Sequence, residues 1–85
     1  MPTFPEWWSW ALSFTGHAEL RMEQRGVTEV EVRAMLERAA RFEPNVVEGR
    51  FMIHVRHLES SWIVIVEPDA DAKLLVVVTV YGVSE

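Results

Sequence analysis

The chain contains no cysteine among its 85 residues, which excludes disulfide bonds, thiolate metal sites and a catalytic thiol. Long hydrophobic runs are also missing. Uninterrupted apolar stretches reach only five residues, as in LLVVV at residues 74–78, which is far less than a membrane span. The first residues lack the basic start and apolar run of a secretory signal. We therefore expect a soluble cytoplasmic protein with no membrane partner.

Positive charge is scarce, since 8 lysines and arginines face 13 acidic residues and the net charge is −5. Residues 14–58 balance seven arginines against seven glutamates, whereas residues 59–85 carry five acids and only Lys73. Phosphate contacts supply most of the affinity of nucleic-acid binding. The acidity therefore disfavours RNA as a partner unless the fold gathers a local basic patch.

Tryptophan is concentrated at the start of the chain, where Trp7, Trp8 and Trp10 fall within four residues. Thr3 and Glu6 have the spacing of a capping box, which predicts a short helix from about Phe4 to Leu12. Two roles remain open for these tryptophans: cover for the core, or a dimer contact. We divide the chain into a Trp-rich segment, residues 1–13, and one domain, residues 14–85.

Two helices are predicted next. Thr15 can cap the first, and Gly26 can end it in the left-handed conformation. Thr28 and Glu31 form a second capping box, which predicts a helix from about Glu29 to Arg41. Its solvated face alternates in sign every four residues, a pattern that favours ion pairs, at Glu29, Arg33, Glu37 and Arg41.

After Pro44 the hydrophobic period changes from 3.6 to 2, which is typical of strands. Residues 50–58, 62–67 and 73–81 form a predicted meander, with a fourth strand around residues 42–47. The predicted fold is α+β, a two-helix hairpin packed on a three- to four-stranded antiparallel sheet. Strand 62–67 is apolar on both faces, so the face away from the helices needs the Trp-rich segment, a partner subunit or a ligand as cover.

A cationic stripe on the first helix, His17, Arg21 and Arg25, is the first candidate site. Like charges four residues apart are mildly unfavourable in a helix, which sets this stripe apart from the alternating second helix. Two guanidiniums can hold a phosphate, and an imidazole can move a proton beside it, as metal-free phosphodiester cleavage requires. The structural alternative is that both arginines pair with Glu43, Glu48 or Glu67.

Thr79 and Tyr81 share one face of the last strand, where cross-strand packing and substrate contact are both open roles. His54 and His57 point to opposite faces of their strand, and no third ligand converges with them. We therefore expect neither a metal nor a cofactor.

Residues 14–28, FTGHAELRMEQRGVT, resemble the opening HAxxRMxxRG motif of a family of bacterial domains of unknown function numbered four-two-five-eight (DUF4258). The later pieces, Val32 to Leu36 and the VVTVY sequence at residues 77–81, also resemble the pattern of that family. The resemblance implies a fold like that of barnase, EndoU, colicin and RelE-type RNases, a group rich in bacterial toxins. By motif position it implies His17, Arg21, Arg25, Thr79 and Tyr81 as site residues.

Two functions follow as expectations. The first is a toxin-like, metal-independent RNase, or a degenerate relative of one, with a cognate antitoxin or immunity protein as partner. The second is a non-catalytic interaction module that forms a homodimer through the Trp-rich segment or the apolar sheet face.

Overall fold

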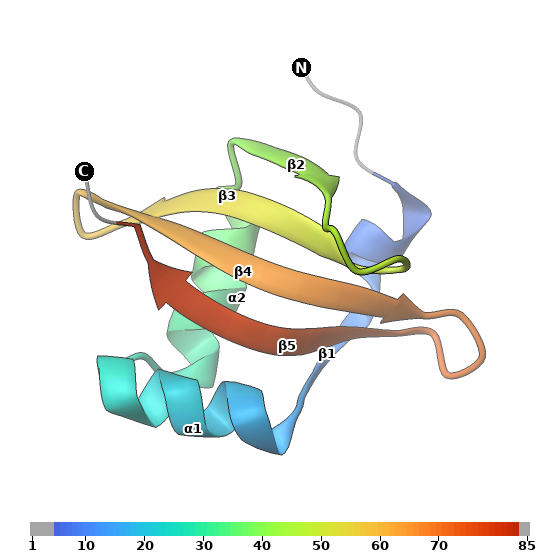
Figure 1. The fold of residues 1–85 in the computed structure, drawn as a ribbon, viewed down its shortest axis with the longest axis horizontal. Coiled ribbons are helices and arrows are strands. Elements are labelled where there is room, and N and C mark those ends of the chain that lie inside the picture. Colours follow the sequence, from blue (N-terminus) through green and yellow to red (C-terminus); the bar gives the residue numbers. More distant parts are fainter. Residues whose placement is uncertain (1–4, 84–85) are drawn as a thin grey trace.

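The computed structural model describes residues 5–83 and shows two helices beside one twisted sheet (Figure 1). In chain order the elements are η1 (Glu6–Ser9), β1 (Ala11–Phe14), α1 (Gly16–Arg25), α2 (Glu29–Glu37), β2 (Arg41–Pro44), β3 (Phe51–His57), β4 (Ser60–Asp69) and β5 (Leu74–Gly82). Helix α2 crosses one face of the sheet, whereas α1 runs along the β5 edge (Figure 1). The α+β class with two helices is therefore confirmed.

The sheet has five strands in the order β1-β5-β4-β3-β2, and it is mixed, because β1 pairs with β5 in parallel. The prediction of three to four antiparallel strands missed β1. The meander of β3, β4 and β5 and the additional strand β2 are antiparallel, as predicted.

The N-terminal segment is not the predicted helix, because residues 6–9 form a short 3-10 helix and residues 11–14 form β1. Thr3 of the predicted capping box lies outside the described residues. Tertiary packing decides the conformation, since the Trp7 ring lies 5.0 Å from Phe51 and the Trp8 ring lies 6.1 Å from Phe42. A regular helix over this segment would lose the pairing of β1 with the free edge of β5.

Both helix starts are confirmed. The Thr15 hydroxyl accepts the Ala18 N–H, and Gly26 ends α1 with a φ of 69°. Thr28 and Glu31 form the complete capping box of α2.

Helix α2 ends at Glu37, earlier than predicted. The Ala40 N–H donates to the His54 carbonyl, and Arg41 is the first residue of β2. Arg41 therefore binds Glu43, at 3.3 Å, instead of extending the predicted ion pairs along the helix. Among residues 5–83, no ion pair joins Glu29, Arg33 and Glu37.

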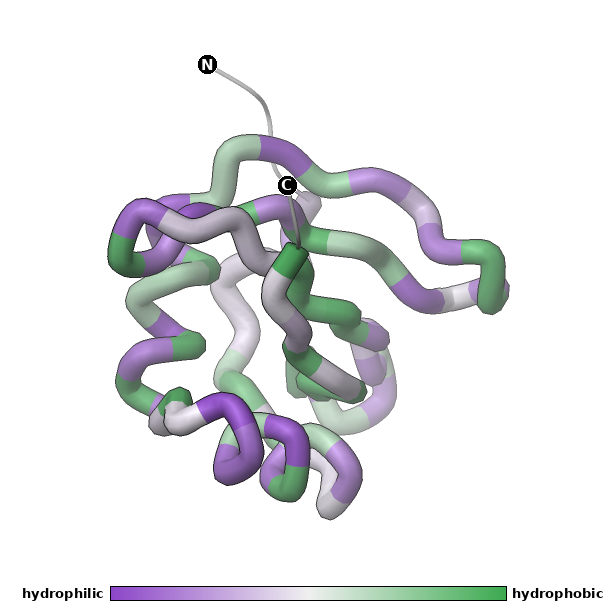
Figure 2. Tube along the Cα trace, turned by 60° about the vertical axis from the view of Figure 1, so that its left-hand side comes forward, coloured by the Kyte–Doolittle hydropathy of each residue, from purple (hydrophilic) through white to green (hydrophobic). Residues whose placement is uncertain are grey.

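The main core lies between the sheet and the helices and includes Met35, Ile53, Val64 and Val77. The three tryptophans of the N-terminal segment also pack against this core. Figure 2 shows green, hydrophobic residues along the central strands, whereas helix α1 is largely purple. The Trp-rich segment thus covers the helix side and leaves the opposite face, here called the open face, without it.

Candidate functional site

The cationic stripe is solvent-exposed on α1. The stripe lies next to the packed side of the helix. His17 and Arg21 directly precede the buried residues Ala18 and Met22, and Arg25 directly precedes Gly26, which ends the helix. Within residues 5–83, none of the three forms a hydrogen bond or an ion pair. Of the three acids proposed as structural partners, Glu43 binds Arg41 and Glu67 binds Arg50, and Glu48 makes no ion pair within the described residues. The guanidiniums of the stripe therefore face solvent, where a ligand can reach them.

Thr79 and Tyr81 lie together on the open face. Their Cα partners on β4 are Ile65 and Ile63, and the intervening Val80 is fully buried in the core on the other side. A register shift beside Ile65 and Val66 sets this alternation. Thr79 and Tyr81 therefore point away from the core layer, and no hydrogen bond within the described residues connects them to the stripe on the neighbouring α1.

The strand register creates a row of side chains across the open face that the sequence did not suggest. Arg41 on β2 lies opposite His54 on β3, His54 lies opposite Ile63 on β4, and Ile63 lies opposite Tyr81 on β5. In the next row Arg56 lies opposite Ser61. Two arginines, a histidine and two hydroxyl side chains thus occupy one end of this face.

This end of the open face is hollowed. A cavity of about 390 Å³ is lined by residues of β2, β3, β4 and the chain after β5, including Arg41, His54, Arg56, Ser61, Ile63 and Val83. Arg56 is held in place because its guanidinium donates to the Glu59 carbonyl at 2.7 Å and to the Ser61 hydroxyl at 3.4 Å. Tyr81 follows in the row beside this open-face hollow but does not line it.

His54 is the group in the hollow that can move a proton. Its Nε2 atom is shielded from solvent and lies 3.5 Å from Glu43 Oε1, a separation that allows an electrostatic contact but does not meet hydrogen-bond geometry. A carboxylate at this position favours the tautomer with hydrogen on Nε2, which leaves Nδ1 as a proton acceptor. Glu43 itself is shared with Arg41, so the three side chains form one charged group at the edge of the hollow.

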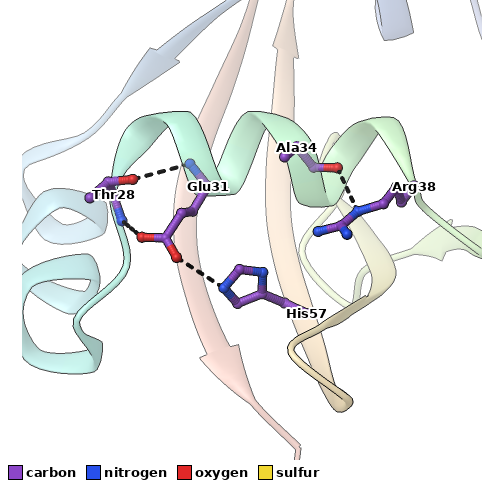
Figure 3. A network of polar contacts seen from close by, with 5 residues as sticks. All are labelled: Thr28, Glu31, Ala34, Arg38 and His57. Carbon is purple, nitrogen blue, oxygen red and sulfur yellow. Dashed lines mark hydrogen bonds and ion pairs between the residues drawn. The ribbon is translucent and has the colours of Figure 1, made fainter.

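A second polar network joins β3 to the start of α2 on the helix side (Figure 3). His57 Nε2 lies 3.0 Å from Glu31 Oε2, and Glu31 Oε1 accepts the Thr28 N–H. This backbone N–H is the largest cause that lowers the pKa of Glu31 below its ordinary value of 4.5, and the Thr28 hydroxyl and His57 also lower it. The network connects the start of α2 to the end of β3.

His54 and His57 lie on opposite faces of β3, as predicted from the period of a strand. In the part of the chain that the structure describes, no three His, Asp or Glu side chains gather into a metal-binding group. No helix in residues 5–83 is long and apolar enough to cross a membrane. The stripe and the open-face hollow contain guanidinium and imidazole groups, which can bind anions and transfer protons.

The signal for the hollow was partly present in the sequence. Alternation along β3 already placed His54 and Arg56 on one face, but Arg41 had been assigned to the second helix. Only the early end of α2 brings Arg41 into β2 and opposite His54.

Comparison with known proteins identifies the domain. The family model for a domain of unknown function, DUF4258, matches residues 14–82. Neither the curated proteins nor the solved structures provide a match. The match covers both helices and the strands β2 to β5 and begins at the end of β1, so residues 1–13 lie outside it. The chain therefore belongs to the DUF4258 family.

Proposed function

We propose that this domain is a metal-independent endoribonuclease of the toxin type, related in fold to the barnase, EndoU, colicin and RelE group. The observation that carries the proposal is the open-face hollow, whose lining includes Arg41, Arg56 and His54, the histidine that contacts Glu43. Two arginines and a histidine in one hollow support a role on RNA, which an acidic chain can have only through a local group of basic side chains.

The chemistry follows from these groups. His54 Nδ1 accepts the proton of a ribose 2′-OH, and the 2′ oxygen attacks the adjacent phosphorus. The bond from phosphorus to the 5′ oxygen breaks, the leaving oxygen takes up a proton, and the products are a 2′,3′-cyclic phosphate and a 5′-OH end. Arg41 and Arg56 stabilise the charge that develops on the phosphoryl oxygens. Glu43 holds the imidazole and stabilises its protonated form.

The residues of the family motif have a place in the same proposal. Helix α1 packs beside β5, so the stripe and Tyr81 belong to adjacent elements at one edge of the sheet (Figure 1). Arg21 and Arg25 would hold phosphates of the same RNA strand, with His17 as the second proton-transfer group. Thr79 and Tyr81 would contact the ribose or base between the stripe and the hollow.

The test is RNA cleavage by purified protein in the presence of a chelator. We expect the wild type to cleave total RNA and His54→Gln and Arg56→Gln to lose at least about a hundredfold in rate, the usual contribution of general acid–base catalysis. A His17→Ala, Arg21→Ala variant examines the stripe separately. Arg38→Gln is the matched control, because the Arg38 side chain is exposed at the end of α2 and, within the described residues, bonds only to the Ala34 carbonyl (Figure 3). Equal cleavage by wild type and His54→Gln, or none by either, would refute the proposal.

A toxin also makes a prediction in the host. Expression of the wild type should arrest bacterial growth, and co-expression of a cognate antitoxin or immunity protein should relieve the arrest. Growth arrest that persists in the His54→Gln and His17→Ala variants would show that the effect does not come from cleavage.

A homodimeric interaction module is the second candidate, and the apolar centre of the open face favours it. Ile63 and Ile65 are buried there outside the main core, and Met52 of β3, beside Ile65 on the same face, is half-buried and offers apolar surface to a partner. Light scattering discriminates the two functions. A dimer of the wild type that dissociates in a Met52→Lys variant supports the module, whereas a monomer at all concentrations removes it.

A further inference from the structure

A second cavity, of about 220 Å³, lies between the N-terminal segment and helix α2. Its apolar surface comes from the buried Leu36 and Leu75 together with the indoles of Trp8 and Trp10, and Arg33 and Glu37 add two opposite charges to its lining. We call it the tryptophan pocket. It is formed on the helix side of the sheet, because Leu36 and Leu75 belong to the main core, and it shares no residue with the open-face hollow.

The two charges of the pocket are available to a ligand. Arg33 and Glu37 are four residues apart on α2, a spacing at which opposite charges usually attract. Both are exposed, and within residues 5–83 neither makes an ion pair or a hydrogen bond. Arg33 and Glu37 therefore line a cavity that has both polar and apolar walls, and neither charge has a partner within the described residues.

The size of the cavity limits its occupant. Pockets for drug-sized ligands measure roughly 300–1,000 Å³, so this one suits a smaller molecule. An apolar body would pack against the leucines and indoles, while an anionic group binds Arg33 and a cationic group binds Glu37. A free α-amino acid with an apolar side chain, such as leucine or phenylalanine, carries these three groups on one carbon.

We propose that the tryptophan pocket binds a free apolar α-amino acid, with its carboxylate on Arg33, its ammonium on Glu37 and its side chain between Trp8 and Trp10. The proposal does not depend on RNA cleavage. Half of the lining comes from residues 8–12, which lie outside the DUF4258 match, and the other half comes from the family domain. The site is thus formed where the N-terminal segment is added to the family fold.

The experiment is a titration of the full chain with L-leucine and L-phenylalanine, followed by tryptophan fluorescence and by the indole N–H signals in NMR spectra. We expect saturable binding by both amino acids. Arg33→Gln and Glu37→Gln should each weaken it by about tenfold or more, because each removes one charge-assisted hydrogen bond. Glu29→Gln is the matched control, since Glu29 is exposed on the same helix and does not line the pocket.

Three analogues of leucine test the chemistry of the ligand. Isocaproate lacks the ammonium, isoamylamine lacks the carboxylate, and N-acetyl-leucinamide lacks both charges, as an internal peptide residue does. All three should bind at least about tenfold more weakly than leucine. Equal binding of N-acetyl-leucinamide would overturn the proposal and indicate a peptide partner instead. Absence of saturable binding by leucine and phenylalanine, or equal binding by the Arg33→Gln variant, would also overturn it.

Discussion

The turn between β3 and β4 allows a direct test of backbone strain in this fold. His57 pairs with Ser60, so only Leu58 and Glu59 form the loop, with φ values of 50° and 66°. Positive φ at both positions is the type I′ hairpin turn, for which Asn-Gly is strongly preferred. Leucine and glutamate have no such preference, and both are therefore strained here.

We expect the double variant Leu58→Asn, Glu59→Gly to be more stable than the wild type. A left-handed residue other than glycine costs roughly 1–2 kcal/mol, and the substitutions relieve part of that cost at each position, so the net gain is about 1–2 kcal/mol. Leu58 is 81% exposed, so its removal sacrifices little packing. For a domain of this size the melting temperature should rise by about 5–10 °C.

The assay is thermal unfolding followed by circular dichroism. Ala70→Gly is the matched control, because Ala70 is an exposed turn residue without a positive φ and should lose a few tenths of a kcal/mol, up to about 1. Arg56 bonds to the backbone carbonyl of Glu59, so the double variant should also keep the open-face hollow and any RNA cleavage unchanged. An unchanged or lower melting temperature would refute the argument that this turn is strained.

Three further predictions concern stability. The pKa of Glu31 is lowered in the folded state, so the stabilisation by its carboxylate is fully present above the unfolded pKa of about 4.5 and is lost as the pH falls through the lower folded pKa. In urea unfolding, the free energies of wild type and Glu31→Gln should therefore differ at neutral pH and converge in acid. A difference that stays constant with pH would contradict this. Met35 is fully buried, so Met35→Ala should lower the unfolding free energy by about 2–5 kcal/mol, and a loss below about 1 kcal/mol would mean that the core is not packed around it. Gly26→Ala should destabilise the domain by about 1 kcal/mol or more, because the φ of Gly26 is 69°. Gly16→Ala, at the start of the same helix with open space around it, should be neutral or stabilising. A larger loss of unfolding free energy for Gly16→Ala than for Gly26→Ala in chemical denaturation would contradict the assigned helix end.

Local signals predicted much of the fold. The caps at Thr15 and Thr28 and the stop at Gly26 were predicted correctly, because a helix terminus depends on hydrogen bonds within a few residues. The strand β3 was also evident from its two-residue hydrophobic period, and β5 was evident from its short run of apolar, mostly β-branched residues.

The errors lie where a distant strand competes with local preference. Residues 11–14 pair with β5, and Arg41 leaves the helical pattern to pair with His54. Neither pairing has a signal within its own segment. For the same reason the sequence indicated the stripe on α1, whose members are four residues apart, but not the row from Arg41 to Tyr81, which spans four strands.

The sequence by itself determined the α+β class, both helix starts, the opposite facing of His54 and His57, and the stripe of His17, Arg21 and Arg25. These features depend on the spacing of residues along the chain, because the period of a helix or strand decides which face each side chain lies on. The tertiary structure alone decided the mixed sheet, the cover that the tryptophans provide on the helix side, and both cavities. Each of these depends on strand register and on packing between segments far apart in the sequence, which no local pattern encodes.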